Sequence, residues 1–254
     1  MIDKMKWPAL ESLGHPKAFL DFCVIMSRYV AEGEVIPVSK IAGVTYLLIA
    51  VNIAVFFIAV YGQSVSEIDA LFNEYGLTPV EIMQGENLVS VVTSMFLHAD
   101  LLHLAMNMLF LFIAGDGVER EMGGGRFLIF YLVCGVLAGF FHVYMNQASD
   151  IPCIGASGAI FGVLAAFAVL FPFRWLVTLL GFIPVPVPAI ILVFLMISAE
   201  TVYAASGGVE NIAHTAHIGG FLAGVFLTLL FGPRKRTPKE TKDKDLDAQL
   251  QNNV

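Results

Sequence analysis

The chain has 254 residues, of which 57% are apolar and only 14% are charged, and its formal net charge is −7. Soluble domains usually carry about 25% charged residues. The composition therefore argues against a soluble enzyme and a disordered chain, and the negative charge also disfavours nucleic-acid binding. Three cysteines provide neither a disulfide framework nor a paired metal-binding spacing. The remaining class is a protein that crosses a membrane several times.

Six apolar stretches, taken in chain order, are predicted to span the membrane. They cover residues 41–61, 101–115, 127–145, 157–171, 189–203 and 212–231. A spanning helix needs about 20 residues to cross about 30 Å of hydrocarbon, and three of these stretches are short. We divide the chain into a cytoplasmic arm at 1–40 with the spacing of a short amphipathic helix, a membrane domain at 41–232, and a charged, disordered cytoplasmic tail at 233–254.

The positions of the lysines and arginines predict the topology. All fourteen lie in the N-terminal arm, the second and fourth loops and the tail, which leaves none for the first, third and fifth loops. The positive-inside rule then places both termini in the cytoplasm. The predicted fold is an all-α membrane protein with a compact bundle of six transmembrane helices. The short arm, the compact size and the lack of a transit-like segment rich in arginine and serine favour a bacterial plasma membrane.

A few polar residues within the predicted spans are candidates for function, because such groups are costly in a membrane. They are His103 and Asn107 in the second span, Ser157 at the start of the fourth, and His214 and His217 at the start of the sixth. Each has an alternative role in helix packing, since serine and histidine also form hydrogen bonds between membrane helices. His98 lies just outside the second span, where we expect a wet environment and no special role.

Three of these residues are predicted to lie at one depth. Ser157, His217 and His103 are each 17 residues from an arginine at the cytoplasmic end of their own helix (Arg174, Arg234 and Arg120). This spacing corresponds to about 25 Å of helix. Because the fourth span is short, its first residue should lie below the outer interface. Irregular backbone at that depth requires a surrounding protein or water-filled cavity, so we predict a hydrated pocket.

The residue types at this level fit nucleophilic catalysis. A serine that opens a helix lies beside free backbone N–H groups, which can hold an anion. Gly155 and Gly158 would let a substrate backbone approach, and a histidine could move the serine proton to a leaving amine. His103 and Asn107, four residues apart, share one helical face and could donate to an oxyanion. The spacing does not decide between His214 and His217 as the base.

We find no acidic residue at this level in the sequence, so the arrangement is predicted to be a dyad rather than a triad. Histidine clusters can bind zinc, but these histidines have no carboxylate or thiolate companion nearby in the sequence. We therefore expect neither a metal ion nor a cofactor.

At these residues the sequence resembles the rhomboid family of intramembrane serine proteases, over residues of about 41 to 232. Four stretches carry the resemblance: Gly155-Ala156-Ser157-Gly158, Ala216-His217 with Gly220 and Gly224, the trio His98, His103 and Asn107, and Glu119 with Gly123. The resemblance implies a six-helix fold with Ser157 as nucleophile and His217 as general base and acid. It also implies that His103, Asn107 and the Ser157 amide stabilise the oxyanion.

The resemblance further implies that the partners are membrane-spanning protein substrates within the lipid bilayer, cut at small residues near or within their transmembrane segments. The fifth helix and the loop after it would act as a lateral gate and cap. One stretch departs from the family pattern, because Glu86-Asn87-Leu88 stands where many members carry Trp-Arg. This departure leaves open how the first outer loop is anchored and which substrates are chosen.

Two other functions stay open from the residues. One is a catalytically inactive rhomboid-like protein that binds client membrane proteins, although such relatives typically lack the serine or the histidine. The other is a small transporter, against which the sequence shows no inverted repeat of three spans. A metalloprotease is disfavoured because no His-Glu-x-x-His occurs.

Overall fold

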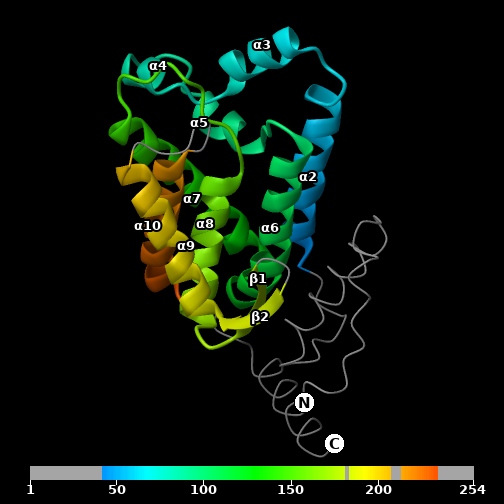
Figure 1. Ribbon diagram of the computed structural model, residues 1–254, viewed down its shortest axis with the longest axis vertical. Helices are drawn as coiled ribbons and strands as arrows, with labels where there is room; N and C mark the ends of the chain where they lie inside the picture. Colours follow the sequence, from blue (N-terminus) through cyan, green and yellow to red (C-terminus); the bar gives the residue numbers. More distant parts are fainter. Residues whose placement is uncertain (1–41, 181–182, 207–212, 234–254) are drawn as a thin grey trace, which may run out of the picture.

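The computed structural model describes residues 42–180, 183–206 and 213–233, so the predicted N-terminal arm and almost all of the predicted tail lie outside the described residues (Figure 1). Six apolar helices overlap the six predicted stretches: α2 (Gly43–Ala59), α6 (Leu101–Met122), α7 (Gly124–Met145), α8 (Ser157–Leu170), α9 (Ala189–Ala205) and α10 (His214–Phe231). By length and composition α6, α7 and α10 are able to cross a membrane, whereas the other three are shorter apolar helices.

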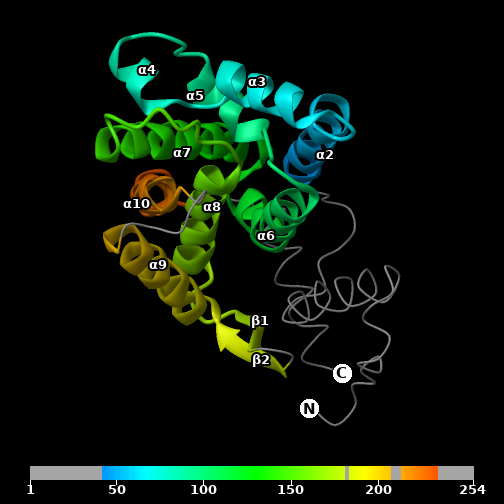
Figure 2. The same ribbon diagram turned by 45° about the horizontal axis from the view of Figure 1, so that its top comes forward.

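Helix α8 lies at the centre of the bundle, with α6, α7, α9 and α10 around it (Figure 2). Every residue from Gly158 to Ala168 is buried. Its packing against α10 depends on glycine, because a Cβ atom on Gly220 would overlap the carbonyl oxygen of Gly158. The same holds one turn further on, where Gly224 meets the carbonyl of Gly162. Small residues of this kind allow two helix backbones to approach closely.

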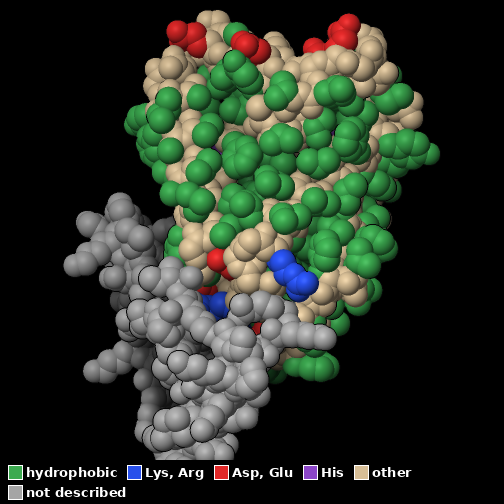
Figure 3. Space-filling model, turned by 180° about the vertical axis from the view of Figure 1, so that it is seen from behind, with side chains coloured by type: hydrophobic (Ala, Val, Ile, Leu, Met, Phe, Trp, Pro, Cys, Tyr) green, Lys and Arg blue, Asp and Glu red, His purple; other side chains and the backbone are tan. Residues whose placement is uncertain are grey.

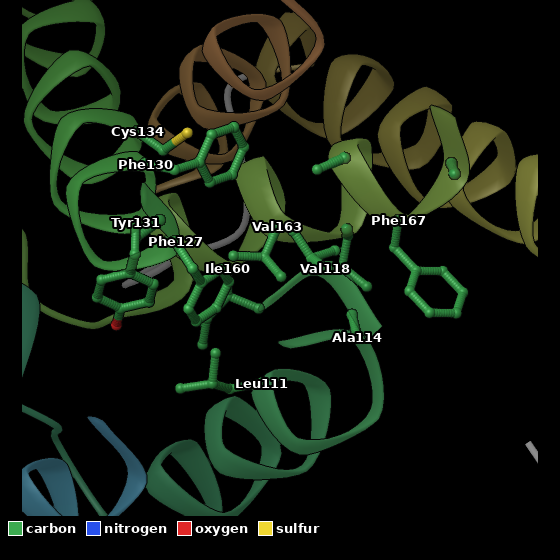
Figure 4. Close-up of a cluster of buried hydrophobic side chains, with 14 of the residues drawn as sticks. Leu111, Ala114, Val118, Phe127, Phe130, Tyr131, Cys134, Ile160, Val163 and Phe167 are labelled. Atoms are coloured by element: carbon green, nitrogen blue, oxygen red, sulfur yellow. The ribbon is translucent and has the colours of Figure 1, made fainter. Parts of the chain in front are cut away.

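The apolar core fills the space between α6, α7 and α8 (Figure 4). The buried side chains that the figure labels come from all three helices: Leu111, Ala114, Val118, Phe127, Phe130, Tyr131, Cys134, Ile160, Val163 and Phe167. Dense packing of large and small side chains without voids is what holds a unique arrangement of helices. This core fixes the axis of α8, and therefore the position of its first residue.

The outer surface of the bundle is also apolar. Large side chains such as Leu102, Phe194, Phe226 and Leu229 are more than half exposed. Hydrophobic side chains cover the middle of the molecule in Figure 3, while carboxylates lie along its upper edge. Soluble monomers rarely expose apolar patches this extensive, so the surface fits a lipid environment.

A β-hairpin connects α8 to α9, which corrects the all-α prediction. Its strands are β1 (Trp175–Leu180) and β2 (Ile183–Pro188), paired in antiparallel register. The prolines of β2 occupy alternate positions, opposite Leu179, Val177 and Trp175. Because side chains and ladder hydrogen bonds alternate along a strand, a regular spacing of two lets prolines avoid the positions that must donate. Hydropathy and charge predicted a loop here. The alternation of the prolines, which is compatible with a strand, was not considered.

The segment between α2 and α6 forms a cap at one end of the bundle from α3 (Val65–Tyr75), α4 (Pro79–Met83), α5 (Ser90–Thr93) and the 3-10 helix η3 (Ser94–Phe96) (Figure 1). Asn87 lies where the family pattern would place Trp-Arg, and it has a left-handed backbone conformation with φ of 47°. Its side-chain amide donates to the Glu74 carbonyl and to Glu81 Oε2, both at 3.1 Å. Asn87 therefore links the residues of α3 and α4 within this segment.

Glu119 fastens α2 to α6 near the opposite end of the bundle. Its two carboxylate oxygens accept from the backbone N–H groups of Val44 at 3.0 Å and Thr45 at 2.7 Å, and also from the Thr45 hydroxyl at 2.7 Å. The first N–H groups of a helix lack internal acceptors, and a carboxylate there also meets the positive end of the helix dipole. Glu119 thus caps the N-terminus of α2 from a distant part of the chain.

Candidate active site

The backbone before Ser157 is anchored to the segment between α2 and α6. Cys153 and Leu77 exchange two backbone hydrogen bonds of 2.9 Å, and the Gly155 N–H donates to the Ser94 carbonyl at 2.9 Å. Gly155 has φ of +122°, a conformation that strongly favours glycine. A Cβ atom there would lie only 3.0 Å from the His103 ring. These restraints place Ser157 at the first turn of α8.

The structure brings Ser157 and His217 into contact from α8 and α10. The Ser157 Oγ atom lies 2.8 Å from His217 Nε2, within hydrogen-bonding distance. The Phe161 ring stacks on the His217 ring with centroids 4.4 Å apart and an interplanar angle of 12°. The close approach of the two helices at Gly158 and Gly220 sets this distance. The hydroxyl and the imidazole are therefore placed for proton transfer between them.

His103 lies beside Gly155, since its Cε1 and Nε2 atoms would each be 3.0 Å from a Cβ atom on that glycine and Ser157 Oγ would be 3.7 Å from the same atom. The Ala99 N–H is 3.4 Å from His103 Nδ1 and donates to it, so in the neutral ring the proton belongs on Nε2. Asp100 caps α6 by accepting from the His103 N–H at 2.8 Å. His103 is thus held as a hydrogen-bond donor near Ser157.

Two other predicted residues have different surroundings. The Asn107 side-chain amide donates to the His103 carbonyl within its own helix at 2.9 Å, and its hydrogen bonds within the described part of the chain include none to Ser157. Gly158 faces Ala138 and Ala216, on α7 and α10. These neighbours are helix-packing contacts, whereas Gly155 faces the site.

The prediction that His98 lies in a wet environment is wrong. His98 is completely buried between η3 and α6, and its ring centroid is 5.1 Å from that of His103. Burial, with a smaller effect of the neighbouring His103, lowers the pKa of His98 to about 4, although a backbone contact with Phe96 partly opposes the shift. The position of His98 just outside the predicted span did not reveal that tertiary packing buries it.

The prediction that no acid lies at the level of the serine is also wrong. Glu200 of α9 places its Oε2 atom 2.5 Å from His214 Nδ1 and 2.9 Å from His217 Nδ1. One ligand atom from each of these three residues lies within 4.8 Å of the other two. The prediction that the histidines have no carboxylate companion is therefore wrong as well. Two histidines and a glutamate are a donor set that zinc uses in proteins. Helix packing created the cluster, since Glu200 and His214 belong to different predicted spans.

Two further residues near the site were missed. Phe161 is four residues after Ser157, which places it on the same face of α8. His142 of α7 is 2.7 Å from the hydroxyl of Thr215, and Asn146 donates to that hydroxyl at 3.0 Å. A histidine inside a predicted span is a signal that the sequence did contain.

Comparison with known proteins places this geometry in a family. Residues 85–234 match the family model described as the Rhomboid domain. The chain is 33% identical over 190 residues to the Rhomboid protease GluP of Bacillus subtilis, covering 74% of this chain and 34% of that protein. It is 28% identical over 209 residues to the Rhomboid protease AarA of Providencia stuartii, covering 74% of this chain and 72% of that protein.

A similar match extends to a eukaryote. Rhomboid protein 1, mitochondrial, of Saccharomyces cerevisiae is 28% identical over 187 residues, which cover 71% of this chain and 51% of that protein. The chain thus spans about a third of GluP and about half of the yeast protein. Because the family model covers more than half of the chain, the chain belongs to the rhomboid family, and with its apolar helices it is an integral membrane protein.

Proposed function

We propose that this protein is an intramembrane serine endopeptidase that hydrolyses peptide bonds in or near the transmembrane segments of other membrane proteins. The observation that carries the proposal is the 2.8 Å contact between Ser157 Oγ and His217 Nε2 in a member of the rhomboid family. Both residues lie in first turns of apolar helices. The names of GluP and AarA as proteases support the same reaction class.

In the first step His217 Nε2 takes the proton of the Ser157 hydroxyl while Oγ attacks the scissile carbonyl carbon. The resulting imidazolium then gives that proton to the leaving nitrogen as the peptide bond breaks, which leaves an acyl group on Ser157. A water molecule then attacks the acyl group and releases Ser157, with His217 acting first as base on the water and then as acid on Ser157 Oγ. The contact distance and the Nε2 orientation allow both transfers without moving the ring.

The negative oxygen of the tetrahedral intermediate requires donors. His103 Nε2–H and the N–H groups of the first turn of α8 are the nearest candidates, because that turn has no internal acceptors. Asn107 has one further amide hydrogen and would need a modest turn of its side chain to join them. Removal of one such donor typically costs about 2.7–4 kcal/mol of transition-state stabilisation.

We further propose that α2, α8 and α9 also span, which gives six transmembrane helices with both termini in the cytoplasm of a bacterial plasma membrane. Helix α8 has 14 residues, about 21 Å of helix, so Ser157 would lie below the outer interface. A soluble protease that removes the tail after Arg236 in inverted vesicles, but not in intact cells, would support this orientation. Cleavage in intact cells would contradict it.

The proposal is tested with a fluorophosphonate probe and a transmembrane substrate, using the purified full-length protein in detergent. We expect the wild type to be labelled and to cleave the substrate, and Ser157→Ala and His217→Ala to do neither. Ser198→Ala is the matched control, because within the described part of the chain its hydroxyl donates only to the Phe194 carbonyl of its own helix. Equal labelling of all the variants would refute the assignment. Substrate binding without cleavage by the wild type would instead favour the client-binding function.

A further inference from the structure

Glu200 lies across the His217 ring from Ser157. Its Oε2 atom is 2.9 Å from His217 Nδ1, while the opposite ring nitrogen, Nε2, contacts the serine. The side chains of Glu200 and His217 are both more than four-fifths buried. A serine, an imidazole and a carboxylate from three helices, α8, α10 and α9, are therefore in successive contact.

A carboxylate at this position suits the chemistry of the ring. For Nε2 to accept the serine proton, the neutral ring must carry its own proton on Nδ1. The Nδ1 atom is buried and makes no well-aligned hydrogen bond to any described residue, and the Glu200 oxygen is the acid within ion-pair distance. A nearby carboxylate favours the proton on Nδ1 and stabilises the imidazolium that forms during the reaction.

The carboxylate is itself restrained. His214 Nδ1 is 2.5 Å from the same Oε2 atom, and the His214 ring stacks on Tyr203 with centroids 5.4 Å apart. Phe161 covers one face of the His217 ring. The His217 ring is therefore bounded by an aromatic face, by the serine at one nitrogen and by a held carboxylate at the other.

We propose that Glu200 is a positioning residue that completes a Ser157–His217–Glu200 triad, held in turn by His214. This inference rests on the proposed protease function. Glu200 acts by keeping His217 in the tautomer with Nε2 free and by stabilising its protonated form. It does not touch the substrate.

Glu200 also has a structural role that the test must separate. Among the described residues of α9 only Ala189 and Val193 are buried apolar side chains, so the contact of Glu200 with α10 also helps to hold α9. Loss of that contact alone would lower thermal stability. It would not specifically lower the rate of the chemical step.

The test compares Glu200→Gln, Glu200→Ala and the control Thr201→Ala. Among the described residues, the Thr201 hydroxyl donates only to the Ile197 carbonyl of its own helix. Cleavage of a transmembrane substrate gives kcat and KM, and the fluorophosphonate reaction gives the rate at which the serine is acylated. We expect Glu200→Gln to lower kcat and the acylation rate by about 100-fold, with KM unchanged within about twofold. The control should match the wild type.

Chemical rescue separates positioning from structure. Formate can enter the space left in Glu200→Ala and should restore kcat at least tenfold, whereas Glu200→Gln leaves no space and should not respond. Wild-type kcat in Glu200→Gln, or a loss in Glu200→Ala that formate does not change, would overturn the triad. Wild-type activity that disappears in EDTA and returns with Zn²⁺ would assign the three side chains to a metal ion, and would also overturn it.

The same experiment separates this inference from the proposed function. If Ser157→Ala still cleaves the substrate, the protease assignment fails and the triad fails with it. If Ser157→Ala is inactive while Glu200→Gln is fully active, only the triad fails.

Discussion

Replacing Gly220 with alanine introduces a methyl group where α8 and α10 approach each other most closely. The new Cβ atom would lie 2.8 Å from the carbonyl carbon of Gly158 and closer still to its oxygen. Carbon atoms in contact are normally about 3.5–4.0 Å apart, so the helices must separate by roughly 1 Å. Because the partner atoms belong to backbone, no side-chain rotation relieves the overlap.

This displacement acts directly on the proposed active site, since Gly220 is three residues from His217 and Gly158 follows Ser157. A shift of roughly 1 Å would stretch the 2.8 Å contact beyond hydrogen-bonding distance. Misplacement of this size costs about 100-fold in rate, and overpacking of this kind costs about 1–3 kcal/mol in stability. We expect Gly220→Ala to cleave a transmembrane substrate about 100-fold more slowly.

Two matched variants distinguish displacement from simple unfolding. Gly224→Ala creates the same overlap with Gly162 two turns from His217, so it should lower the melting temperature similarly but reduce activity less. Gly125→Ala has nothing within 4 Å of the added atom and should change neither property. Wild-type activity in a folded Gly220→Ala protein would refute the reasoning. So would equal activity losses in Gly220→Ala and Gly224→Ala.

Two further predictions concern stability. Glu119→Gln should lower the free energy of unfolding by about 3 kcal/mol. A hydrogen bond to a charged group contributes about 1.5–3 kcal/mol, and the amide keeps only one accepting oxygen. Denaturation in mixed micelles measures this loss. Asp116→Asn, which breaks only a partly exposed ion pair with Arg120 in its own helix, should cost less than about 1 kcal/mol, and equal losses would contradict the capping role. The pKa of His98 is about 4 in the folded protein. Between pH 6.5 and about 4 its imidazole is therefore protonated in the unfolded chain but not in the folded protein. Stability should therefore fall as the pH drops from 6.5 to about 4, by about 3 kcal/mol in total. The melting temperature of His98→Gln should lack this component, and an identical pH dependence in both proteins would show that His98 is not the cause.

Much of the bundle was predictable because its signals are local. Apolar length marks a helix that can lie in lipid, and all six stretches became helices whose bounds differ from the predicted ones mainly at α6, which continues to Met122. That extension carries Asp116 and Glu119, whose charges ended the apolar run without ending the helix. Helix formation depends on backbone hydrogen bonds as well as on hydropathy, so a charged final turn was missed.

The sequence by itself determined the class of the protein, the approximate helices, and Ser157 with two candidate histidines, between which only the family resemblance chose His217. These follow from composition, periodicity and the cost of polar groups in a membrane, which are properties of short segments. Only the tertiary structure decided which groups meet: that Glu200 of α9 lies beside His217, that Glu119 caps a helix 74 residues earlier, and that His98 is buried. Contacts between distant segments depend on how the helices pack, and in this bundle glycine contacts between α8 and α10 set that packing.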